Sequence, residues 1–162
     1  MVRLRGVGGV CLLAVLGCGY RFTSRAAGLP EGVRSVCAPV FRNDTPEPAL
    51  EVLFTRAFRQ ELLRAGVLGS GKCEASVEGV VVSVSSYPTL INYRASATVV
   101  VRLVKDGRVL SETTVSGNED FLTGPPGVPV DVLEAEANRQ AALQRLGEAL
   151  MREAYDRLAS NW

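Results

Sequence analysis

The residues considered first for chemistry in this 162-residue chain are its four cysteines and its 17 aspartate and glutamate residues. There is no histidine, which is the commonest general base and metal ligand, and no Gly-x-Ser-x-Gly motif. Asp44 and Glu47 could form a carboxylate pair, but they stand in a turn before a predicted helix, where acids favour the positive end of the helix dipole. The sequence therefore predicts a protein that is not an enzyme and that holds no metal and no cofactor.

The N-terminal segment is typical of an exported protein. Two arginines and no acid precede an apolar run over residues 10–16, which is too short to cross a bilayer as a helix. The run ends at Gly17-Cys18, and this junction resembles a bacterial lipobox, in which the chain is cut before the cysteine and the cysteine takes up acyl chains. We expect residues 1–17 to be a signal peptide and Cys18 to be the lipidated N-terminus. The alternative is a buried apolar segment that happens to contain a cysteine.

Lipidation at Cys18 would anchor the protein to a membrane without a spanning helix. Each methylene buried in the bilayer contributes about 0.8 kcal/mol, so two or three acyl chains hold a protein stably. In enterobacterial lipoproteins an Asp after the acylated cysteine often retains the protein in the inner membrane, and Gly19 stands at that position here. The sequence thus favours the cell outer membrane, with the domain on its periplasmic side.

Cys37 and Cys73 remain as a pair if Cys11 leaves with the signal peptide and Cys18 is acylated. Two interpretations of this pair stay open. In an oxidising periplasm the two cysteines can form a disulfide, whereas two buried free thiols would pack as small hydrophobic side chains.

The charge balance argues against nucleic acid as a partner. The chain has 18 basic and 17 acidic residues, and removal of Arg3 and Arg5 with the signal peptide leaves 16 basic against 17 acidic. A nucleic-acid-binding domain normally carries a strongly basic stripe. With 47% hydrophobic and 22% charged residues, the chain fits a single globular domain over residues 33–162, joined to the anchor by a short lead over residues 18–32.

The spacing of apolar residues predicts six elements of secondary structure. Three- and four-residue spacing marks the helices, alternation marks the strands, and Asp106-Gly107 predicts a tight hairpin between the last two strands. A change of phase predicts a β-bulge beside Gly79, and Gly147 in the second helix is either a weak point or a point of close contact. The strands are expected over residues 33–41, 74–85, 91–104 and 109–117, and the helices over 49–65 and 131–158.

The element order is β-α-β-β-β-α without an internal repeat, which favours an α+β fold. Two helices with one apolar face each can both cover the same face of a mainly antiparallel four-stranded sheet. The opposite face, which carries Arg94, Thr98 and Arg102 on the third strand, would then have no cover. Such a face is usually solvated, and in a protein held at a membrane it could equally bind a partner.

Several stretches of the chain resemble one family of bacterial lipoproteins. The specific ones are a Gly-Cys-Gly-Tyr sequence over residues 17–20 and a Phe-x-Asn-x-Thr block over residues 41–45, with further similarity over residues 29–33 and 39–57. In these stretches the chain resembles LptE, the outer-membrane lipoprotein that joins LptD in placing lipopolysaccharide on the cell surface. The resemblance implies a domain that sits as a plug inside the LptD β-barrel, helps this barrel to fold and interacts with lipopolysaccharide.

The resemblance also implies two regions of contact with lipopolysaccharide. Basic residues of the family linked to this lipid lie near the loop between the second and third strands and near the entry to the last helix. In this sequence the first region has no cation before Arg94, and the second has none before Arg139. Arg94 is therefore the candidate ligand-binding residue, and the alternative is a solvated arginine on a strand.

Lipoprotein activators of penicillin-binding proteins are the main alternative, because they resemble the same Phe-x-Asn-x-Thr block. These activators reach an inner-membrane synthase across the peptidoglycan through a long disordered linker. Here only about a dozen residues separate Cys18 from the first predicted strand, and at roughly 3.3–3.6 Å each they are too few to span that gap. The short lead favours a partner in the same membrane as the anchor.

Overall fold

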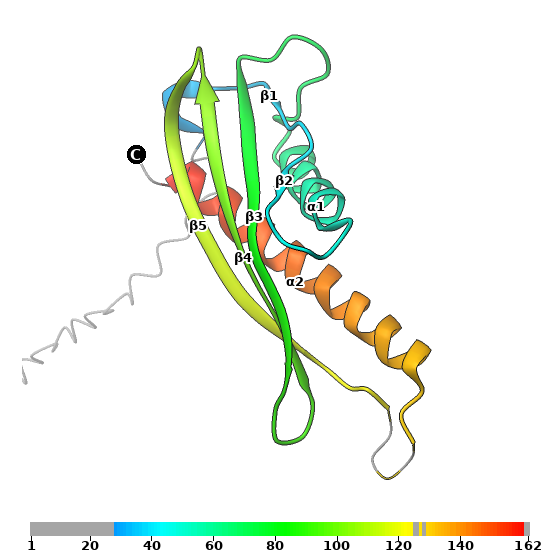
Figure 1. Cartoon of the computed structure of the whole chain (residues 1–162). Helices are drawn as coiled ribbons and strands as arrows, with labels where there is room; N and C mark the ends of the chain where they lie inside the picture. The colour runs from blue at the N-terminus through cyan, green and yellow to red at the C-terminus, as the bar shows by residue number, and fades with distance from the viewer. Residues whose placement is uncertain (1–27, 125–126, 128, 161–162) are drawn as a thin grey trace, which may run out of the picture.

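The computed structural model describes residues 28–124, 127 and 129–160, so the predicted signal peptide and Cys18 lie outside the described residues. Within this part of the chain, a twisted sheet of long strands has both helices on one of its faces (Figure 1). The elements in chain order are η1 Pro30–Gly32, β1 Val36–Cys37, β2 Arg42–Asn43, α1 Leu50–Arg64, β3 Ala75–Pro88, β4 Tyr93–Lys105, β5 Arg108–Phe121 and α2 Val132–Ser160.

The sheet has five strands in the order β1-β3-β4-β5, and β2 pairs with the same strand as β1, farther along β3. The two short strands run parallel to β3, whereas β3, β4 and β5 are antiparallel to their neighbours. The predicted α+β fold, with two helices on a mainly antiparallel sheet, is thereby confirmed. The structure has five strands where four were expected, because only Val36–Cys37 of the first predicted strand pairs with the sheet, and β2 forms just beyond its predicted end.

That first strand is interrupted because part of its backbone bonds to α1 instead of to the sheet. The Phe41 amide donates to Thr55 Oγ1 (2.8 Å), and Arg59 Nε donates to the Ala38 carbonyl oxygen (2.8 Å). Pro39, which lies between these two contacts, has no N–H to offer to β3. Two short parallel pairings with β3 are the result.

The tight hairpin predicted at Asp106-Gly107 is present, with φ angles of 51° and 75° at these two residues. Positive φ at both central positions is the geometry of a type I′ turn, which Asp-Gly favours. The bulge predicted beside Gly79 lies elsewhere, because the register between β3 and β4 shifts between Val81 and Ser83. Gly79 itself keeps the regular pairing of the strand and is buried.

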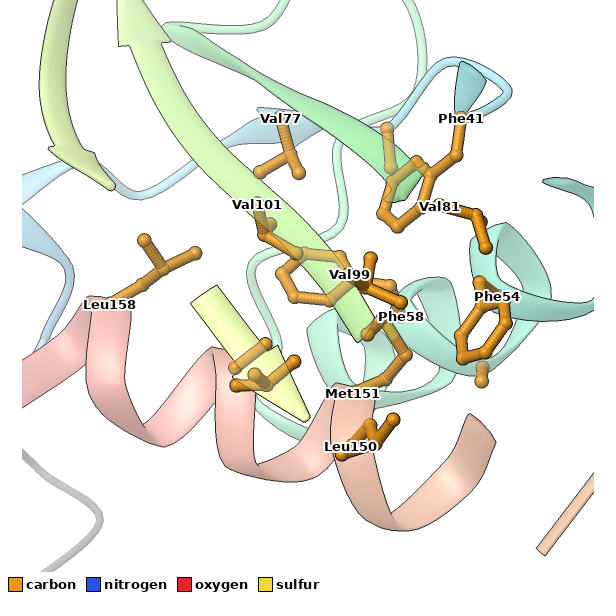
Figure 2. Packing of buried hydrophobic residues seen from close by; sticks show 14 of the residues in the cluster. Phe41, Phe54, Phe58, Val77, Val81, Val99, Val101, Leu150, Met151 and Leu158 are labelled. Atoms are coloured by element: carbon orange, nitrogen blue, oxygen red, sulfur yellow. The ribbon is translucent and has the colours of Figure 1, made fainter. Parts of the chain in front are cut away.

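The core fills the space between the inner face of the sheet and the two helices (Figure 2). Phe54 and Phe58 of α1 and Met151 of α2 are fully buried, in one cluster with Val99 and Val101 of β4. Full burial of such a side chain contributes about 1.5–3 kcal/mol relative to exposure. Every second residue of β4 faces this core, which is why strict alternation marks this strand in the sequence.

The two helices approach each other closely at Gly147. A Cβ built on this residue would lie 2.5 Å from Leu53 Cδ2 of α1, so a side chain here would force the end of Leu53 to move. Of the two expected roles of Gly147, the structure shows the close contact. A second link between the helices is the buried Glu61 of α1, which pairs with Arg64 and with Arg152 of α2.

Candidate functional site

The Phe-x-Asn-x-Thr block forms the passage from β2 into α1, and Asn43 is its centre. Asn43 Oδ1 accepts hydrogen bonds from the Thr45 amide (3.0 Å) and the Thr45 hydroxyl (2.8 Å). Its Nδ2 donates to the Glu47 carbonyl (2.7 Å) and to Glu51 Oε2 (3.0 Å). These bonds hold the turn in which Ala49 takes a left-handed φ of 67° directly before the helix. Within this block, Asn43 and Thr45 position α1, and the described contacts of both are local.

The uncovered face of the sheet is mainly polar, apart from Val80 and Val100, which lie side by side on β3 and β4, and we call it the outer face. Ser83, Thr98 and Ser116 lie side by side across β3, β4 and β5. Along the same face Arg102 pairs with Glu112 on the neighbouring strand. Among the described residues, no helix covers this face (Figure 1). Its side chains suit contact with water or with a polar partner surface.

Arg94, the predicted ligand-binding residue, lies on the outer face near the start of β4. Its guanidinium is held in a fork by the carboxylate of Asp120 on β5, with Nε–Oδ1 and Nη2–Oδ2 distances of 2.6 and 2.9 Å. These hydrogen bonds raise the pKa of Arg94 and lower the pKa of Asp120 from their ordinary values. Both side chains are more than a third exposed. Arg94 is therefore available to solvent but already has an anionic partner.

Arg139, the first cation of the α2 region, is also occupied. It pairs with Glu47 from the passage before α1, donates from Nε to Ser86 Oγ of β3 (3.1 Å) and from Nη1 to Glu136 (3.2 Å). The hydrogen bond with Glu47 raises the pKa of Arg139. This half-buried arginine ties α2 to two other elements, which is a structural use of its charge.

One end of the molecule exposes large apolar side chains, and sequence reasoning missed this feature. The β3–β4 turn and the segment that leads into α2 lie at this same end (Figure 1). Leu90 is fully exposed at 102%, and Leu133 is 82% exposed. Concentrated apolar exposure marks surfaces that bind other molecules. We call this surface the apolar end; its residues are Leu90, Ile91, Leu122, Val130, Val132 and Leu133.

The sequence did contain a signal for the apolar end. Leu90 and Ile91 stand inside a turn, where polar residues are usual, but alternation assigned Ile91 to the following strand. That strand begins only at Tyr93. Asp131 accepts the Leu133 amide (2.9 Å) at the start of α2, so the apolar residues there belong to an exposed first turn of the helix.

The structure joins Cys37 of β1 to Cys73, which lies just before β3, with a Cα–Cα distance of 5.6 Å. This linkage ties the first strand to the loop that follows α1. In the described part of the chain, His, Cys, Asp and Glu side chains do not assemble in threes as metal ligands would. None of the helices described combines the length and the apolar character needed to cross a membrane.

This fold is shared with several solved bacterial proteins. Hypothetical protein CT253 from Chlamydia trachomatis matches with a TM-score of 0.56 and 12% identity, over 77% of this chain and 95% of that chain. A predicted lipoprotein from Caulobacter crescentus matches with a TM-score of 0.56 and 15% identity, over 75% and 89%. The PelC dodecamer from Paraburkholderia phytofirmans matches with 0.53 and 13%, over 83% and 89%. These similarities define the class of protein by fold alone, as a small α+β domain.

A family model defines the chain more narrowly. The model for LptE, described as lipopolysaccharide-assembly, matches residues 33–159. This chain belongs to the LptE family, which confirms the resemblance seen in its sequence. A comparison with curated protein sequences finds no match.

Proposed function

We propose that this protein is an outer-membrane lipoprotein that binds an LptD-like β-barrel, assists its assembly and takes part in lipopolysaccharide transport to the cell surface. The observation that carries the proposal is the match of the LptE family model over residues 33–159. In this proposal residues 1–17 are removed as a signal peptide, Cys18 carries the acyl chains, and residues 33–162 form one domain that acts by binding and not by catalysis.

The outer face supports a position inside the barrel. Lumens of large outer-membrane barrels are polar and hydrated. The outer face presents hydroxyl side chains such as Thr98 and Ser116 together with the ion pairs Arg94–Asp120 and Arg102–Glu112. A surface of this kind can face a polar wall without the cost of burying unpaired charge.

The apolar end supports contact with the acyl chains of lipopolysaccharide. Its leucine, isoleucine and valine side chains are exposed to solvent in the isolated chain, and burial against acyl chains would remove that apolar surface from water. Arg94 and Arg139 near this end are paired with Asp120 and Glu47. A phosphate of the lipid would have to displace Asp120 to bind Arg94, so Arg94 is a secondary contact in this proposal.

Depletion of the protein in its host tests the proposed function. We expect less correctly assembled LptD-like barrel in the outer membrane and less lipopolysaccharide on the cell surface, and normal amounts of both would contradict the proposal. Co-purification of the tagged full-length lipoprotein from detergent-solubilised outer membrane should recover the barrel. Recovery of a peptidoglycan synthase in its place would favour the alternative class of lipoprotein activators.

A further inference from the structure

β5 is a long strand with one free side. It has 14 residues and pairs with β4 along one side only, and no strand in the described residues pairs with the other. Edge strands in natural proteins are usually short, twisted away or covered by charged side chains, because their free N–H and C=O groups can pair with another chain.

The hydrogen bonds of the sheet show which backbone groups of β5 point outwards. The Val81 carbonyl accepts the Asp44 amide (3.0 Å), so the backbone N–H and C=O groups of Val81 point away from β4. Val99 of β4 lies opposite Val81, so the backbone groups of Val99 point towards β5. Val115 of β5 lies opposite Val99, and its backbone groups bond to β4. Because hydrogen-bonded and non-hydrogen-bonded residues alternate along an antiparallel pair, the even-numbered residues around Val115 direct their N–H and C=O groups outwards.

Two side chains of α2 donate hydrogen bonds to backbone carbonyls on this edge, and the stretch of β5 between these two carbonyls is the gap. Arg157 Nη1 donates to the Thr114 carbonyl (2.9 Å), and Asn138 Nδ2 donates to the Leu122 carbonyl (3.0 Å). The later α2 residue, Arg157, bonds to the earlier β5 residue, so α2 runs antiparallel to β5. The spacings agree, because the two α2 residues are about 28 Å apart along a helix and the two carbonyls about 26 Å apart along a strand. Among the described residues, nothing is bonded to the outward backbone groups that lie between, those of Ser116, Asn118 and Asp120.

Charge protects this gap on one side only, where Arg145 of α2 pairs with Glu119 (2.7 Å) on the inner side of β5. Asp120 is held by Arg94 and Glu112 by Arg102, both on β4, so the two carboxylates are drawn back over the sheet. Ser116 lies between them and is uncharged. The backbone of the gap is therefore open to an added strand, and a neighbour on its outer-face side would lie beside two ion pairs, Arg94–Asp120 and Arg102–Glu112.

We propose that the edge of β5 from Ser116 to Asp120 accepts an extended strand of the partner barrel protein, paired backbone to backbone. This inference rests on the proposed function. The free backbone groups of the edge call for an extended strand, and the exposed polar side chains of Ser116 and Asn118 suit a strand with polar residues beside them. A second copy of this chain is a poorer occupant. The outward residues are Glu112, Thr114, Ser116, Asn118 and Asp120, and antiparallel pairing of two copies centred on Ser116 would place Glu112 of each copy opposite Asp120 of the other.

Proline substitution tests the pairing, with a matched alanine control. Ser116→Pro and Asn118→Pro each remove an N–H that is unbonded in the isolated chain, and proline is tolerated on the free side of an edge strand. Ser116→Ala and Asn118→Ala keep the N–H. We expect each proline variant to recover about tenfold less of the host's LptD-like barrel in co-purification, because proline removes one backbone hydrogen bond to the partner strand and its ring blocks the approach of that strand. The alanine variants should recover the wild-type amount, and wild-type recovery by a folded proline variant overturns the inference.

Amide hydrogen exchange on the wild-type lipoprotein gives a test that does not depend on whether a variant folds. In the free protein the amides of Ser116, Asn118 and Asp120 should exchange fast, whereas those of Gly117 and Glu119 are protected by β4. In the complex with the barrel all five should be protected. Fast exchange of the three outward amides in a complex that does form overturns this inference and leaves the proposed function standing. Failure of the wild-type protein to bind the barrel overturns both, and a homodimer that Ser116→Pro dissociates assigns the edge to a second copy.

Discussion

The ring of Phe41, directly before β2, fills the space that a side chain at Gly79 of β3 would need. A Cβ built on Gly79 would fall inside van der Waals contact with ring atoms Cγ, Cδ2 and Cε2. The same ring packs against Phe58 of α1 with a centroid distance of 5.9 Å. The absence of a side chain at Gly79 therefore lets β2 lie on β3 and lets Phe41 reach the core, which gives the phenylalanine of the Phe-x-Asn-x-Thr block a structural role.

Substitution of Gly79 by alanine should destabilise the protein. Overpacking of this kind costs about 1–3 kcal/mol, because the ring and its neighbours must shift. Gly117→Ala is the control, since the nearest atom to its Cβ is the flexible end of Leu150 at 3.2 Å, and it should cost less. Urea unfolding measures both. If the Phe41 ring is the obstacle, Phe41→Leu combined with Gly79→Ala should cost less than the sum of the single changes; strict additivity would contradict the contact.

The Cys37–Cys73 disulfide should contribute measurably to stability in protein purified from the periplasm. It links residues separated by 36 positions, and the loop-entropy model gives about 3–4 kcal/mol for a loop of this length, as an upper value. The double variant Cys37→Ala/Cys73→Ala should unfold at lower urea concentration than the oxidised protein and near that of the reduced one. Alkylation and mass spectrometry without reductant should find neither thiol free. Two alkylated thiols would show that the exported protein carries free cysteines.

The Arg94–Asp120 pair should appear in the pH dependence of stability. The pKa of Asp120 is lowered in the folded protein by its hydrogen bonds to Arg94. A lowered pKa means that the pair stabilises the fold above the unfolded pKa of about 4, and that this contribution is lost as pH falls through the folded value. Carboxyl NMR titration should place Asp120 below its ordinary pKa, and Arg94→Gln should raise that pKa. An unchanged midpoint in the variant would mean that the fork does not persist in solution.

Polar substitution at the apolar end should separate function from stability. Leu90→Ser and Ile91→Ser change exposed side chains, so the free energy of unfolding should stay within about 0.5 kcal/mol of wild type. Binding of the purified protein to lipopolysaccharide should fall severalfold. Leu63→Ser is the matched control, because Leu63 is also exposed but lies on α1, away from this end, and its replacement should leave binding unchanged. Equal loss of binding in all three variants would argue against a specific surface.

The first predicted strand shows what a local sequence pattern can predict and what depends on contacts with distant residues. Alternation over residues 33–41 predicted one continuous strand, of which only Val36–Cys37 is present. The interruption depended on Thr55 and Arg59 of α1, which take backbone bonds that the sheet would otherwise use. The same holds for Arg94, whose type and strand position were readable, whereas its partner Asp120 is 26 positions away in the chain.

The sequence by itself determined the two helices and the three long strands, the tight hairpin at Asp106-Gly107 and the membership of a lipoprotein family, because periodicity, turn chemistry and motifs are properties of neighbouring residues. Only the tertiary structure decided why Gly79 is a glycine, which side of β5 stays open and how two separate apolar segments come to share one end of the molecule. Those features depend on register and packing between residues far apart in the chain, and no local pattern encodes which residues will meet.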